Sequence, residues 1–103
     1  EYPVTVNDPA AYDFVADTVR EIFGEERFEP LADPITGSED FSRVLAAVPG
    51  AYVFLGATTA EDPMLAPDNH SPRAKFDDGV LADGAALLAE LAVRRLATLE
   101  ATA

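Results

Sequence analysis

Cysteine and tryptophan are absent from the 103 residues, and histidine occurs once. Without cysteine, disulfides and thiolate metal sites are excluded, and the lack of thiols fits a reducing compartment. We therefore expect a cytoplasmic protein. No apolar run reaches the roughly 18 residues of a membrane-spanning helix, so no membrane partner is expected. A catalytic zinc ion takes about three protein ligands, so one histidine does not make such a site.

Basic residues are also scarce. The chain has 7 lysines and arginines against 19 acidic residues, and its net charge is -12. Because this field repels a nucleic-acid backbone and an anionic membrane, we expect neither as a partner. Hydrophobic residues make up 49% of the chain, which is enough for a core and excludes wholesale disorder. The first residue is not methionine, so we expect a chain cut or processed from a longer one.

Two stretches have a clear helical periodicity. A helix is predicted over residues 9–23, with Asp8 as its N-cap and Gly24 as its C-terminal stop. Another helix is predicted from about residue 78 to residue 100, and its many alanines would let it lie close against a sheet.

Three further stretches are predicted as strands. Residues 2–6 alternate in polarity, residues 51–55 (AYVFL) form a near-continuous apolar run, and residues 27–31 form a weaker candidate. The order of strands and helices favours an α/β fold with helices packed on a sheet. Residues 56–77 form a long loop with three prolines, and such a loop in a compact domain is usually functional or disordered.

A short helix is predicted to open near residue 36. Thr36 with Glu39 three residues later has the form of a capping box, and Ser38 is a competing cap. Free N–H groups at Gly37 and Ser38, with the positive end of the helix dipole, can hold a carboxylate. Acidic residues in a first turn can equally stabilise the dipole themselves, so both interpretations stay open.

The single histidine, His70, lies in the predicted long loop. Neutral imidazole is a good zinc ligand, but a lone histidine in a loop is more often an ordinary surface residue. Adjacent acidic residues such as Glu61 and Asp62 point in different directions on regular backbone, so they do not predict a catalytic pair.

Several short motifs, in their order and spacing, together resemble one known family. They are GSEDFS at 37–42, VPGAY at 48–52, FLG at 54–56, HSP at 70–72, and FD at 76–77 running into Leu81 and Gly84. The pattern is similar to the C-terminal part of the zinc amidohydrolases that include hippurate hydrolase, aminoacylases and auxin-conjugate hydrolases, with carboxypeptidase G as a more distant relative. Thr36 stands where relatives often have methionine, which leaves substrate preference open.

The resemblance implies a two-domain enzyme, in which a catalytic α/β domain is interrupted by a smaller lid or dimerisation domain. Residues 1–7 would be the last strand of that inserted domain. Residues 8–103 would be the C-terminal part of the catalytic domain, a portion of a helix-covered mixed sheet. Asn7 and Asp8 would mark the hinge. The N-terminal remainder of the same enzyme would be the partner, and the complete enzyme would be a possible homodimer.

By the same resemblance, His70 matches the family's last metal ligand, and the other ligands and the general base lie outside this chain. The complete enzyme would bind two divalent ions, zinc or alternatively cobalt, nickel or manganese, that activate water against the acyl carbonyl. Gly37, Ser38 and Glu39 match a substrate-binding loop near the carboxylate of a small N-acyl amino acid. No catalytic residue is expected in this chain. The alternative hypothesis is an acidic, non-catalytic binding or dimerisation module.

Overall fold

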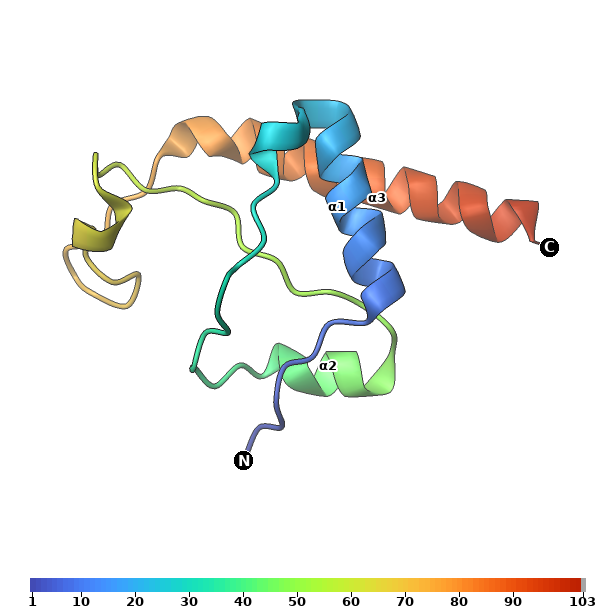
Figure 1. The fold of residues 1–103 in the computed structure, drawn as a ribbon, viewed down its shortest axis with the longest axis horizontal. Coiled ribbons are helices and arrows are strands. Elements are labelled where there is room, and N and C mark those ends of the chain that lie inside the picture. Colours follow the sequence, from blue (N-terminus) through green and yellow to red (C-terminus); the bar gives the residue numbers. More distant parts are fainter. Residues whose placement is uncertain (103) are drawn as a thin grey trace.

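The structure is a computed structural model that describes residues 1–102, and α-helices form its main elements. Figure 1 shows α3 crossing α1, with α2 apart from both at the lower edge. The helices and the short 3₁₀ turns between them are α1 (Pro9–Phe23), η1 (Glu25–Arg27), α2 (Phe41–Ala47), η2 (Pro63–Leu65), η3 (Asp78–Val80) and α3 (Leu81–Ala101). No helix within residues 1–102 is both long and apolar enough to cross a membrane.

Helix α1 has the predicted bounds because both of its end signals operate. The Asp8 side chain accepts a hydrogen bond from the N–H of Ala11 at 2.9 Å, and Pro9 starts the first turn. At the other end Gly24 adopts a φ of 107°, which favours glycine, and its N–H donates to the carbonyl of Arg20. The prediction of this helix and of both its caps is confirmed.

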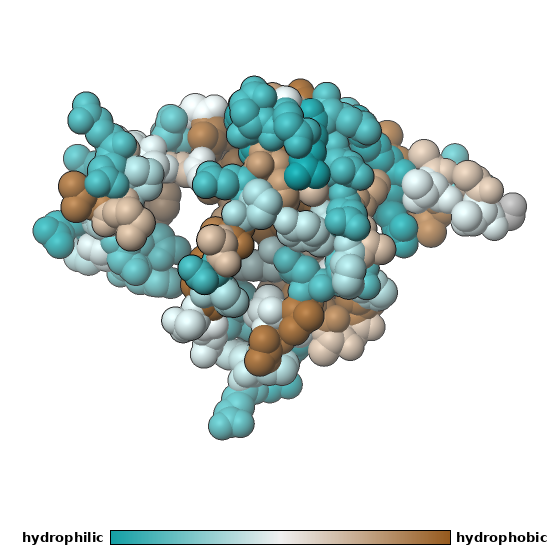
Figure 2. All heavy atoms as spheres, viewed as in Figure 1, coloured by the Kyte–Doolittle hydropathy of each residue, from teal (hydrophilic) through white to brown (hydrophobic). Residues whose placement is uncertain are grey.

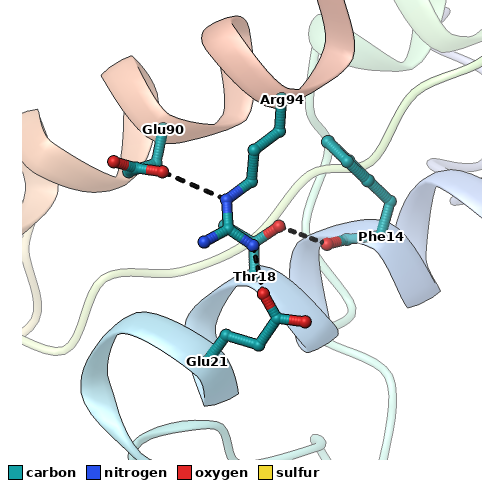
Figure 3. A network of polar contacts seen from close by, with 5 residues as sticks. All are labelled: Phe14, Thr18, Glu21, Glu90 and Arg94. Carbon is teal, nitrogen blue, oxygen red and sulfur yellow. Dashed lines mark hydrogen bonds and ion pairs between the residues drawn. The ribbon is translucent and has the colours of Figure 1, made fainter. Parts of the chain in front are cut away.

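The contact between α1 and α3 combines a small buried patch with charged pairs around it. Ala16, Thr18 and Val19 are buried on α1, and the Thr18 hydroxyl donates to the carbonyl of Phe14 at 2.8 Å. Arg94 of α3 pairs with Glu90 on its own helix and with Glu21 on α1, as Figure 3 shows. These carboxylates raise the pKa of Arg94, so its guanidinium group stays protonated. Pairs this exposed stabilise only modestly, so they mainly set how the helices meet.

The predicted α/β fold with a helix-covered mixed sheet is wrong for the described residues. Residues 2–6, 27–31 and 51–55 carry no strand, and the β-pairing within residues 1–102 is a single antiparallel bridge between Thr58 and Phe76. Residues 1–7 form no strand in this structure. Their assignment to an inserted domain stays a prediction.

The reason is that a ladder needs a second extended backbone alongside, which an apolar run cannot supply by itself. Near the start of the predicted strand 51–55, the main-chain N–H and C=O of Tyr52 are paired with the side chain of Asn7. Pro3 removes a donor from the first predicted strand. Helix α3, expected to lie on a sheet, instead crosses α1 and comes so close to Leu55 that a Cβ on Gly84 would lie 2.9 Å from it.

Helix α2 starts later than predicted, at Phe41, with Asp40 as its N-cap residue. The capping box of Thr36 and Glu39 is not formed, because the Glu39 carboxylate turns forward to the N–H of Phe41. The apolar side chains of this helix are also only partly buried. Val44 and Val48 are exposed, whereas Ser42 is 2% exposed and its hydroxyl has no hydrogen-bond partner among residues 1–102.

The chain is open for its size. Its accessible surface is 8252 Å², whereas a compact monomer of its 11.0 kDa mass exposes roughly 5,600 Å². The radius of gyration is 15.4 Å, against about 13 Å for a compact domain of this length. Many large apolar side chains are exposed, among them Val4, Phe54, Leu88 and Leu96. Figure 2 shows apolar patches on the visible face and an open gap between the lobe at the left and the main body.

Candidate functional site

Gly37 and Ser38 lie in an exposed, irregular segment just before α2. A Cβ built on Gly37 would meet no atom within 4 Å, so the space around it is open. The backbone N–H groups of both residues make no hydrogen bond to any of residues 1–102. These two donors are therefore left for solvent or for an anionic ligand.

The Glu39 carboxylate follows directly, and both of its oxygens are engaged. Oε1 accepts from the N–H of Phe41 at 3.1 Å, and Oε2 accepts from the hydroxyl of Tyr52 at 3.2 Å. These donors favour the ionised form and lower the pKa of Glu39, with the Phe41 N–H first and the side chains of Asp40 and Tyr52 adding to it. The hydrogen bond to Glu39 and its charge raise the pKa of Tyr52. The Glu39 carboxylate is therefore fixed in place by two hydrogen bonds that favour its ionised form. This suits a supporting role better than proton transfer.

The position of Tyr52 is fixed by ring contacts and by hydrogen bonds to its main chain. Its ring contacts those of Phe41 and Phe54, with centroid distances of 5.5 and 5.4 Å. The Asn7 side chain pairs with the Tyr52 backbone, accepting from its N–H at 2.8 Å and donating to its carbonyl at 3.4 Å. Beside this pair, the N–H of Asp8 donates to the carbonyl of Gly50 at 2.9 Å.

Sequence reasoning did not single out Tyr52 as a functional residue. It stands inside the apolar run 51–55, where its hydroxyl carries no local signal of a partner. Its partners are 13 and 45 residues away, so only the fold brings them to it. Asn7 was marked as a hinge residue by the resemblance, but nothing in its neighbourhood indicated the contact with Tyr52.

His70 lies exposed in the loop between α2 and α3. Its backbone N–H donates to the Asp68 carboxylate at 2.7 Å, a contact across two residues that shapes a local turn. The loop is closed only at its base, where the N–H of Asp77 donates to the carbonyl of Ala57 and Thr58 bridges Phe76. Within residues 1–102, no hydrogen bond or ion pair joins this loop to segment 37–42. Gly37, Ser38 and Glu39 are neighbours in the sequence, and no polar contact within residues 1–102 joins His70 to them.

A complete metal site does not fit the described residues by themselves. Within residues 1–102 no group of three histidine, cysteine, aspartate or glutamate side chains is placed to hold an ion. The His70 imidazole makes no hydrogen bond to any of these residues, so it is able to supply one ligand. Any ion bound there would need its other ligands from outside them.

Comparison with known proteins shows which family the chain is similar to. Residues 1–94 match the model of peptidase family M20/M25/M40. The chain is 37% identical over 102 residues to the IAA-amino acid hydrolase ILR1-like 4 of Arabidopsis thaliana. This match covers 98% of the chain and 22% of the relative. It is 39% identical over 93 residues to thermostable carboxypeptidase 2 of Saccharolobus solfataricus (90% of the chain, 22% of the relative). It is 35% identical over 94 residues to the hippurate hydrolase of Campylobacter jejuni (91% and 23%).

The chain thus spans about a fifth of the length of the curated relatives it matches, and in each case nearly all of the chain is used. The sequence-based assignment to a family that includes hippurate hydrolase and auxin-conjugate hydrolases is confirmed. The matched residues 1–94 include both candidate segments described above, 37–42 and the loop that carries His70. The chain belongs to peptidase family M20/M25/M40, a family whose named relatives are hydrolases.

Proposed function

We propose that the chain is the C-terminal part of a metal-dependent, cytoplasmic amidohydrolase of the aminoacylase type that cleaves the amide bond of N-acyl amino acids. The observation that carries this proposal is the family match over residues 1–94. Two of the relatives are named as hydrolases of hippurate and of IAA-amino acids, and both names describe an amino acid in amide linkage. A third relative is named a carboxypeptidase, which makes a peptide a second substrate to test.

His70 is proposed as one metal ligand of the complete enzyme. Its exposed imidazole has no competing hydrogen bond within residues 1–102, which supports this role. Zinc is the first choice, and cobalt, nickel and manganese are alternatives because neutral imidazole suits several of these ions. When bound, the two metal ions would polarise the acyl carbonyl and activate a water molecule.

Gly37 and Ser38 are proposed to bind the free carboxylate of the substrate through their N–H groups, with Glu39 in support. The open space at Gly37 and the two unused donors favour this role. Backbone N–H groups are common ligands for carboxylates because they carry partial positive charge without a mobile side chain.

The partner is proposed to be the N-terminal remainder of the same enzyme, which would pack on the exposed apolar side chains. The chain exposes roughly 2,600 Å² more than a compact monomer of its mass, well above the roughly 800 Å² that each partner buries in an interface of standard size. Leu88, Leu96 and Phe54 are among the side chains that such packing would cover.

The test uses the longest natural reading frame that contains residues 1–103, called the full-length protein below. It is stripped of metal with a chelator, reloaded separately with Zn²⁺, Co²⁺, Ni²⁺ or Mn²⁺, and assayed on hippurate, an IAA-amino acid and a peptide with a free C-terminal carboxylate. We expect metal-dependent hydrolysis of at least one amide. No hydrolysis with any ion would overturn the proposal and favour a non-catalytic binding module.

The ligand role of His70 is tested in the same protein by His70→Ala, with the neighbouring Asn69→Ala as the matched control. We expect His70→Ala to lose bound metal and to lower activity more than about 100-fold, since the loss of mere outer-shell contacts already costs 10–100-fold. Asn69→Ala should keep both. Full metal occupancy with full activity in His70→Ala would show that His70 is not a ligand.

A further inference from the structure

Helices α1 and α3 differ in the residues that they expose. Between residues 11 and 20, the exposed side chains of α1 are Asp13 and Asp17. Helix α3 instead exposes apolar residues that recur every three or four positions and therefore share one side of the helix. These residues, called the outer stripe below, are Leu81, Ala85, Leu88, Ala92, Leu96 and Leu99. Helix α1 thus has the polar outer side of a surface helix, and α3 does not.

The inner side of α3 is already used by this chain. Arg94 pairs there with Glu21 of α1, and Leu91 is half-buried on the same side. On the outer stripe, by contrast, Leu88 and Leu96 are 71% and 61% exposed. A helix with apolar residues on more than one side is typical of a protein interior, so the outer stripe is expected to be covered.

The outer stripe is long and holds no acidic residue. It runs from Leu81 to Leu99, a length of about 27 Å by the rise of an α-helix. Figure 1 shows the C-terminal half of α3 extending past α1. Alanines between the leucines let another surface come close to the helix, and Arg95 at the border can carry its charge to the edge on a flexible side chain. Monomeric soluble proteins rarely expose large contiguous apolar patches, which mark interaction surfaces.

Two observations favour the rest of the same polypeptide as the cover over a second copy of the chain. The chain spans 22% of the length of two of its relatives, so most of the length of those proteins has no counterpart in residues 1–103. A second copy would bring another net charge of -12 to this surface, and the repulsion between the copies opposes pairing.

We propose that the outer stripe of α3 is an internal packing face. An apolar, uncharged surface formed by residues of the same polypeptide outside 1–103 covers it, so that α3 lies between that surface and α1. This inference rests on the proposed function, which takes the chain as part of a larger enzyme, and it adds which face the remainder occupies. The stripe includes neither segment 37–42 nor His70, so the inference is tested without substrate or metal.

The first test measures whether the outer stripe is covered in the full-length protein. Leu88→Cys is treated with a maleimide, and labelling of the peptide that holds the new cysteine is followed by mass spectrometry. Asp13→Cys is the matched control, because Asp13 is exposed on α1 and makes no ion pair within residues 1–102. We expect Leu88→Cys to react at least about 100-fold more slowly in the folded protein, because labelling then requires a local opening. Equal rates would overturn the proposal.

A second cysteine variant answers the case in which Leu88→Cys does not fold. Ala92→Cys lies one turn further along the stripe and adds only a sulfur atom, so it disturbs the packing less than the loss of a leucine does. We expect the same slow labelling. Fast labelling of Ala92→Cys, in a protein that still unfolds cooperatively in urea, would overturn the proposal.

The second test separates the rest of the polypeptide from a second copy as the cover. Leu88→Glu places a charge on the stripe, and Ala10→Glu, the control, places one on an exposed position of α1. We expect Leu88→Glu to lower the urea midpoint of the full-length protein by about 1 M or more at every protein concentration, and Ala10→Glu to leave it unchanged. A Leu88→Glu protein as stable as wild type that changes from dimer to monomer in native mass spectrometry would show that a second copy covers the stripe, and would overturn the proposal.

The proposed function and this inference fail separately. If the full-length wild type hydrolyses an amide while Leu88→Cys and Ala92→Cys react as fast as Asp13→Cys, the packing role of the stripe is wrong and the proposed function stands. If the wild type hydrolyses no amide with any metal ion while both cysteines stay protected, the proposed function is wrong and the rest of the polypeptide still covers the stripe.

Discussion

The two candidate segments of this chain are held in opposite ways. Segment 37–42 is tied to distant parts of the sequence through Glu39, Tyr52 and Asn7. Within residues 1–102, the loop that carries His70 is shaped by contacts across two or three residues and is closed at its base by Ala57 with Asp77 and by Thr58 with Phe76. The comparison teaches that long-range contacts of this chain hold segment 37–42 in place, whereas the contacts of the His70 loop within residues 1–102 are short-range apart from those at its base.

The largest expected effect comes from the Asn7 contact that holds segment 37–42. Asn7→Ala leaves the half-buried N–H and carbonyl of Tyr52 without partners, which costs about 1–3 kcal/mol. We expect faster amide exchange across residues 50–54 and weaker protection at Phe41. Asn69→Ala in the loop serves as the control and should leave both regions unchanged. Equal amide protection in Asn7→Ala and wild type would mean that the Asn7 contact does not hold segment 37–42 in place.

The next effect concerns the base of the loop. The Asp77 side chain accepts from the N–H of Gly79 at 2.8 Å and so caps the turn that leads into α3. Asp77→Ala should cost about 1 kcal/mol, the usual loss for a missing cap, while Asp77→Asn should retain most of it. Urea unfolding of the full-length protein, or amide exchange at residues 79–82, measures it. A loss confined to Asp77→Ala would show that the side chain caps this turn, and equal stability of Asp77→Ala and wild type would contradict it.

A pH dependence follows from the lowered pKa of Glu39. A carboxylate whose pKa is lower in the folded than in the unfolded state stabilises the fold above its ordinary pKa, here 4.5, and loses this contribution as pH falls through the folded value. Glu39→Gln should therefore be less stable than wild type near neutral pH, and the gap should narrow below about pH 4.5. Thermal unfolding of both proteins between pH 3 and 7 tests this, and a gap that widens in acid contradicts it.

The smallest expected effect is the change in stability caused by replacing His70. His70 is exposed, and its imidazole makes no hydrogen bond within residues 1–102, so His70→Ala should change stability in the absence of metal by less than about 0.5 kcal/mol. Urea unfolding of the chelator-treated protein measures it. A loss above about 1 kcal/mol would mean that the loop is packed by its histidine, and the contrast between the two segments would then weaken.

Helix α1 could be predicted to the residue because its signals are local. Asp8, Pro9 and Gly24 act within one turn of the helix ends, and the structure uses all three. The start of α2 could not, because Glu39 does not complete the predicted capping box and bonds instead to the N–H of Phe41 and to the hydroxyl of Tyr52, 13 residues away. The three strands were wrongly predicted for a related reason, since alternation and apolar runs indicate a tendency, and a ladder requires a partner backbone.

The sequence by itself determined the family, both ends of α1 and the types of side chain available for chemistry, because motifs, caps and composition are read within short windows. Only the tertiary structure decided that Tyr52 meets both Glu39 and Asn7, and that His70 stands apart from Gly37 and Ser38. The physical reason is that hydrogen-bond partners far apart in the chain are chosen by how the whole backbone turns. No local pattern records that choice.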